Sequence, residues 1–150
     1  MISASDAIPK GRIPMQVNPY LHFNGNCEEA MKYYQKVLGA KIEAMFPYEN
    51  GPPDMPTPPE YKKKIMHAKV TIDGEVLMAA DSPPGHFKEP QGFSVSLQVE
   101  DPADAERRFK ALAEGGTVFM PFGKTFFSKG FGMCTDQFGV PWMVNCPAEM

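Results

Sequence analysis

His67 is the residue of this chain whose type and setting most favour chemistry. It stands in the segment 65–72, IMHAKVTI, where apolar residues alternate as they do in a strand with one buried face. An imidazole on the other face could act as a general base or hold an anionic group. A structural histidine bonded to a neighbouring strand or to Tyr20 explains the residue equally well. His22 stands close to a turn, and for it we favour the structural interpretation. His67 is therefore the candidate catalytic residue, with its role left open.

The elements that would position these residues occur twice. Alternating strands are expected over 17–23 and 93–99, and an amphipathic helix follows each of them. Asp101 before Pro102 predicts the start of the second helix. The apolar stripes of the two helices are Ala30, Tyr33, Tyr34, Val37 and Leu38, and Ala105, Phe109, Leu112 and Ala113. After each helix come a glycine, an apolar strand and a hairpin. This order predicts an α+β fold of two βαβββ modules.

The chain is expected to form a single domain, because 150 residues are enough for one core but marginal for two. We place the two repeats at 17–81 and 92–146. A loose N-terminal arm is expected over 1–16, and a linker over 82–91. The segment 47–60 is rich in proline, so neither a helix nor a central strand is expected there.

Composition narrows the classes of partner. The net charge is −3 with acids and bases interspersed, so no basic face for nucleic acid is predicted. No apolar run is long enough to span a bilayer, so a membrane partner is not expected either. Cys27, Cys134 and Cys146 lack a Cys-x-x-Cys spacing and predict reduced thiols in a cytoplasmic protein.

The chain resembles a known superfamily in three stretches: PYLHFNGNCEEAMKYYQKVLGA, IMHAKVTIDGEVLMAADSPPG and FGMCTDQFGVPWMVN. They are similar to the vicinal oxygen chelate superfamily, which includes glyoxalase I, bleomycin-resistance proteins and extradiol dioxygenases. Within it the chain most resembles the PhnB-like group. The resemblance implies that the two modules form a cupped mixed sheet, the glyoxalase/bleomycin resistance fold. It also implies a homodimer.

Strand alternation indicates which side chains would line that cup. Val17 and Phe93 belong to the apolar sets that should pack under the helices, and the residues alternating with those sets should face the cup. Superposing the hairpins on Gly74 and Gly139 brings two methionines to equivalent positions. The expected ligand-binding residues are Tyr20, His22, His67, Met78, Ser94, Ser96, Gln98, Met143 and Asn145. An apolar floor with scattered hydrogen-bonding groups is typical of a small-molecule pocket.

The positions that usually hold the divalent metal in this superfamily correspond to Asn18, Met78, Ser94 and Met143. None of them is a histidine or a carboxylate, the donors that such ions prefer, and thioethers suit softer ions. We therefore expect neither the usual metal site nor any other cofactor.

Three functions remain open. The leading prediction is a small-molecule-binding protein without the usual metal, as among bleomycin-resistance relatives. The alternative is a metal-dependent lyase, isomerase or dioxygenase-type enzyme that acts on a small oxygenated metabolite. The third is a cup filled by its own side chains, which the polar residues Ser94, Ser96 and Gln98 disfavour. Members of this group have also carried a methyltransferase label, but no glycine-rich nucleotide loop supports that activity here.

Overall fold

The computed structural model describes residues 14–148, so most of the predicted N-terminal arm lies outside the described residues. The first half contains β1 (Tyr20–Phe23), α1 (Cys27–Leu38), β2 (Lys41–Pro47), β3 (Ile65–Ile72) and β4 (Glu75–Asp81). The second half contains β5 (Val95–Gln98), α2 (Pro102–Ala113), β6 (Thr117–Gly123), β7 (Ser128–Thr135) and β8 (Pro141–Pro147). The element order of the first half thus recurs in the second.

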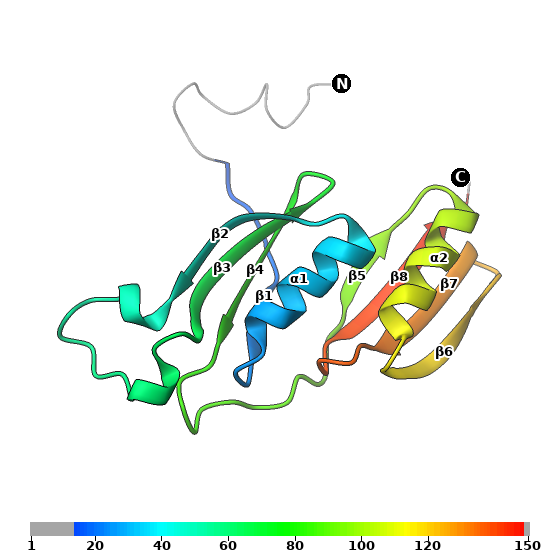
Figure 1. Ribbon diagram of the computed structural model, residues 1–150. Helices are drawn as coiled ribbons and strands as arrows, with labels where there is room; N and C mark the ends of the chain where they lie inside the picture. Colours follow the sequence, from blue (N-terminus) through cyan, green and yellow to red (C-terminus); the bar gives the residue numbers. More distant parts are fainter. Residues whose placement is uncertain (1–13, 149–150) are drawn as a thin grey trace.

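The two sheets share one topology. Sheet A has the strand order β1-β4-β3-β2, and sheet B has the equivalent order β5-β8-β7-β6. In each sheet the first strand runs parallel to the last, and the other neighbours are antiparallel. Both helices lie on the same side of the two sheets, which are arranged side by side (Figure 1). The prediction of an α+β fold with two βαβββ modules is confirmed. Within residues 14–148, each sheet keeps one face without a helix.

The helices begin and end largely as the sequence indicates. The Asp101 side chain caps α2 by accepting a hydrogen bond from the backbone N–H of Asp104 at 2.9 Å. Gly39 ends α1 with a left-handed φ of 67°. The start of α1 differs, because the buried Asp81 at the end of β4 accepts hydrogen bonds from the N–H groups of Gly25 and Cys27. A carboxylate from a distant strand therefore replaces a local cap.

Two residues placed in the core from the alternation are exposed instead. Val17 is 94% exposed and Phe93 is 52% exposed. Both precede their strands, since β1 begins at Tyr20 and β5 at Val95. The alternation extends beyond the paired strands at both places, so the expectation that Val17 and Phe93 are core residues is wrong.

The proline-rich segment consists of loop and two short 3₁₀ turns, Tyr48–Asn50 and Pro59–Tyr61. Tyr48 and Tyr61, at the two ends of the segment, pack against each other with ring centroids 5.3 Å apart. The Tyr48 hydroxyl donates to the carbonyl of Asp81 at 2.6 Å, and the Tyr61 hydroxyl donates to the carbonyl of Ser82. These bonds tie the segment to the end of β4 of its own chain.

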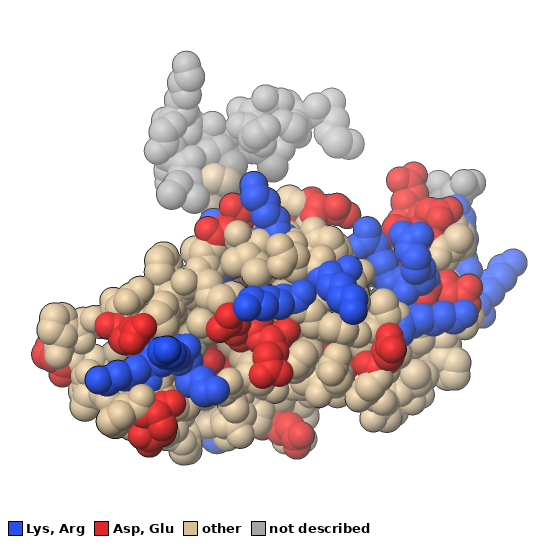
Figure 2. Space-filling view, viewed as in Figure 1, with Lys and Arg blue, Asp and Glu red and all other residues tan. Residues whose placement is uncertain are grey.

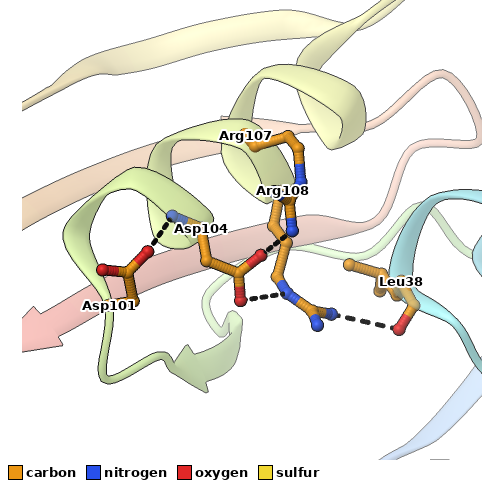
Figure 3. A network of polar contacts seen from close by, with 5 residues as sticks. All are labelled: Leu38, Asp101, Asp104, Arg107 and Arg108. Atoms are coloured by element: carbon orange, nitrogen blue, oxygen red, sulfur yellow. Dashed lines mark hydrogen bonds and ion pairs between the residues drawn. The ribbon is translucent and has the colours of Figure 1, made fainter.

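A polar network joins α2 to the end of α1 (Figure 3). The Arg108 guanidinium donates to Asp104 Oδ2 at 3.1 Å and to the carbonyl of Leu38 at 3.0 Å. That carbonyl lies in the last turn of α1, where helical acceptors lack intrahelical partners. Arg107 contacts the other oxygen of Asp104. Arg108 therefore satisfies a helix end in one module while it is held by a carboxylate of the other.

A second contact between the modules is buried. The Tyr34 hydroxyl of α1 donates to Asp136 Oδ2 at 2.5 Å, and the Trp142 indole N–H donates to the same oxygen at 2.8 Å. The other oxygen of Asp136 accepts from the N–H groups of Phe138 and Val140, which closes the β7–β8 turn. Trp142 lies in the core and is 0% exposed.

The face that carries the helices shows lysine and arginine interspersed with aspartate and glutamate (Figure 2). Among the described residues, no helix is both long and apolar enough to cross a membrane.

Candidate functional site

The helix-free face of sheet A gathers three ring side chains. Tyr20 on β1 and His67 on β3 meet, with the Tyr20 hydroxyl 3.0 Å from His67 Nδ1. The ring of His22 also packs against Tyr20, with centroids 5.1 Å apart. Leu21, between Tyr20 and His22, and Ala68, next to His67, are buried. Alternation along the strands therefore brings the three rings together on the open side, as predicted.

The contact between Tyr20 and His67 engages one of the two imidazole nitrogens. Burial raises the pKa of Tyr20 above its ordinary value, and Cys27 adds to this. The phenol therefore keeps its proton at neutral pH and shares a hydrogen bond with Nδ1 of His67. That bond uses Nδ1, so Nε2 is the nitrogen that His67 offers to a ligand on the open face.

The helix-free face of sheet B carries neutral amides and a hydroxyl. The Gln98 amide N–H donates to Ser96 Oγ at 2.9 Å, and the Asn145 amide N–H donates to Gln98 Oε1 at 2.8 Å. Asn145 Oδ1 is buried and has no hydrogen-bond partner among residues 14–148. An acceptor in this state favours a ligand that brings its own N–H or O–H group.

Strand register makes these two sets equivalent positions of the two modules. The neighbours across the parallel strand pairs are Tyr20 with Met78 and His22 with Ala80 in sheet A, and Ser96 with Met143 and Gln98 with Asn145 in sheet B. The alignment of Met78 with Met143 is thus confirmed. Aromatic and imidazole groups in one module replace hydroxyl and amide groups in the other.

The positions expected for a metal do not fit a divalent ion. Asn18 and Ser94 both precede their strands, and the Asn18 amide N–H donates to the carbonyl of Val76 at 3.3 Å. Met78 and Met143 offer only thioethers. Among residues 14–148, no three histidine, cysteine, aspartate or glutamate side chains are grouped to hold a metal ion.

One residue of the open face was missed from the sequence. Phe131 on β7 lies beside Asn145 and is 7% exposed, because the ring of Phe127 covers it with centroids 5.2 Å apart. The alternation of Phe131 and Met133 along the strand predicts that both side chains share one face of the sheet. These rings occupy part of the sheet B face, at the position equivalent to His67 in sheet A.

Both open faces lie on the side away from the helices, within one row of strands (Figure 1). Tyr20, His22 and His67 therefore belong to one sheet, while Ser96, Gln98 and Asn145 belong to its neighbour. Within residues 14–148, no hydrogen bond or ring contact joins the two groups.

Comparison with known proteins identifies the family. The model of the 3-demethylubiquinone-9 3-methyltransferase family matches residues 15–145. The chain belongs to this family. Among curated relatives, Protein YjdN of Escherichia coli K12 is 37% identical to this family member over 142 residues, which is 87% of this chain and 95% of that protein.

Solved structures extend the comparison. PA1353 from Pseudomonas aeruginosa is 49% identical to this family member, with 91% of this chain and 100% of that chain covered and a TM-score of 0.81. The PhnB protein from Bacillus cereus is 28% identical over 88% of this chain and 99% of that chain, with a TM-score of 0.72. A glyoxylase/bleomycin resistance protein/dioxygenase domain from Frankia sp. EAN1pec shares the fold, at 15% identity over 91% of this chain and 100% of that chain, with a TM-score of 0.65. The predicted resemblance to the PhnB-like group is confirmed, and the predicted glyoxalase/bleomycin resistance fold is shared with the Frankia domain.

Proposed function

We propose that the protein binds a small organic molecule on the helix-free faces of its sheets, without the usual divalent metal of the superfamily. The observation that carries this proposal is that the helix-free faces of both sheets present hydrogen-bonding side chains. His67 supplies an imidazole nitrogen beside the ring of Tyr20, and Asn145 supplies an acceptor that lacks a donor within residues 14–148. A small oxygenated molecule with an apolar part matches that combination.

We further propose that the binding protein is a homodimer. Apolar side chains remain exposed at the outer edges of the open faces: Phe46, beside His67, is 48% exposed, and Met120, beside Met133, is 41% exposed. A second copy that laid sheet B against sheet A would bury these groups and enclose the polar ones. The three cysteines, which are buried free thiols, support a cytoplasmic location.

A metabolite-capture experiment tests ligand binding. The purified protein is equilibrated with a cell extract, separated from unbound molecules by gel filtration and denatured, and the released molecules are identified by mass spectrometry. We expect at least one small molecule at near-stoichiometric amount with the wild type. His67→Ala should lose it, and Lys32→Ala, which changes an exposed side chain of α1 on the opposite side of sheet A, should retain it. Binding that is equal in all three proteins would remove His67 from the site, and no enriched molecule would contradict the proposal.

Light scattering and elemental analysis test the other two parts. A monomer at micromolar concentration by multi-angle light scattering would contradict the homodimer. A near-stoichiometric divalent ion in protein purified without chelator, lost in His67→Ala, would favour the alternative of a metal-dependent enzyme. A metal-free, folded protein would support the binding protein.

A further inference from the structure

A groove runs between the two modules on the side that carries the helices. It has a volume of about 720 Å³ and lies between the β3–β4 hairpin of sheet A and β5 with the first turns of α2. The residues that form its floor belong to the helix-facing sets of the strands. Tyr20 and His67 of the open face do not line the groove, whereas the polar residues Ser96 and Gln98 of β5 reach its edge.

The floor of the groove is apolar. Leu77 from β4 and Trp142 from β8 form its base. Val95 and Leu97 of β5, with Val99 just after that strand, form one wall. These three wall side chains are half-buried, so they keep part of their surface within reach of a ligand. Such a floor favours the apolar body of a small molecule by the hydrophobic effect.

The rim of the groove is acidic. Five carboxylates line it and one cation does: Asp73, Glu75, Glu100, Asp101 and Asp104, against Arg108. Arg108 is already held by Asp104 and by the Leu38 carbonyl, and Asp101 caps α2 (Figure 3). The exposed carboxylates of Asp73, Glu75 and Glu100 form no ion pair with any residue in the range 14–148. The lining therefore carries three negative charges that nothing in this part of the chain neutralises.

We propose that this groove is a second ligand site and that it binds a small organic cation with an apolar body, such as an aryl-substituted ammonium ion. The cationic group lies between the carboxylates of Glu75 and Glu100, and the apolar group lies on the β5 wall. The charge of the groove lining favours a cationic ligand. The unpaired carboxylates would repel an anion, and Arg108 already forms bonds with Asp104 and the Leu38 carbonyl.

Binding of benzyltrimethylammonium tests the proposal, with phenylacetate as the anionic control and benzyl alcohol as the neutral one. We expect saturable ¹H–¹⁵N shifts at the amides of Val76, Leu77 and Val95–Val99 with the cation, and much weaker binding of both controls. The chain has one tryptophan, so the fluorescence of Trp142 gives a second readout of the same site.

Charge-neutral variants separate the groove from the rest of the surface. The double variant Glu75→Gln/Glu100→Gln should raise the Kd of the cation by about fivefold or more at low salt, and the difference should shrink at high salt. Glu60→Gln, an exposed carboxylate in the distant 3₁₀ turn, should leave the Kd unchanged, as should His67→Ala. Equal binding of phenylacetate, an unchanged Kd in the double variant, or no saturable shift at the groove would overturn the proposal. The unaltered response expected of His67→Ala separates this test from the group of Tyr20 and His67 on the open face of sheet A.

Discussion

Removal of the Tyr34 hydroxyl should loosen the contact between the two modules. In the folded chain this hydroxyl is buried and donates to the Asp136 carboxylate, which also holds the Trp142 indole and the β7–β8 turn. The substitution Tyr34→Phe deletes one charge-assisted hydrogen bond without removing the ring. It therefore isolates the bond from the packing of α1.

The expected magnitude follows from the character of the acceptor. A hydrogen bond to a charged group contributes about 1.5–3 kcal/mol, so Tyr34→Phe should lower the free energy of unfolding by about 2 kcal/mol. For a chain of this size that corresponds to a fall in Tm of about 4–8 °C. Tyr48→Phe is the matched control, because that hydroxyl donates to the neutral carbonyl of Asp81. Its loss should cost about 1 kcal/mol.

Urea unfolding of a double-mutant cycle tests the reasoning directly. Asp136→Asn removes the charge that Tyr34 donates to, so Tyr34→Phe should cost clearly less in that background than in the wild type. A coupling energy of about 1 kcal/mol or more is expected. Additive effects, within about 0.5 kcal/mol, would refute the assignment of this bond as a charge-assisted link between the modules.

Alkaline pH gives a second signature of the same residue. Burial raises the pKa of Tyr34 well above 10, and the Asp136 charge adds to it. The folded state therefore keeps the proton while the unfolded chain loses it. Stability present below pH 10 should then be lost as the pH rises, by up to about 1.4 kcal/mol per unit for this group. Tyr34→Phe should show a smaller decrease than the wild type, and equal slopes would contradict the pKa shift.

Three further outcomes are expected. Gly116→Ala should strongly destabilise the fold by thermal unfolding, since an added Cβ would lie 2.0 Å from the Thr135 carbonyl, whereas Gly123→Ala, where nothing lies within 4 Å, should change the Tm little. Asp101→Ala should lower stability by about 1 kcal/mol in urea through loss of the α2 cap, and no change would show that the cap is dispensable. Burial raises the pKa of Cys134 to about 11 and raises that of Cys27 further. Both thiols should therefore react slowly with Ellman's reagent at pH 8 until urea is added. Rapid reaction of the folded protein would contradict the burial of these thiols.

Local patterns in the sequence were sufficient for most of the secondary structure. The helix stripes around Tyr34 and Phe109 and the cap at Asp101 are consequences of neighbouring residues, and the structure contains them as predicted. The alternation failed at Val17 and Phe93, because the apolar pattern continues past the point where the strands find partners. Pairing partners, which the pattern does not contain, decide where a strand begins.

The open-face site was predictable in its composition and not in its contacts. Alternation placed Tyr20 and His67 on one face, and the structure adds that they share a hydrogen bond. Alternation would also have found Phe131 if it had been applied to β7, but its cover by Phe127 depends on how the preceding loop folds back.

The sequence by itself determined the duplicated α+β architecture, because helical and strand periodicities are local properties of the chain. The tertiary structure alone decided how the modules meet. Asp136 lies 102 positions from Tyr34, and Arg108 lies 70 positions from Leu38, so no local pattern could predict that either pair would form a bond. The groove between the modules exists for the same reason, since its apolar floor and acidic rim come from segments that only the packed fold brings together.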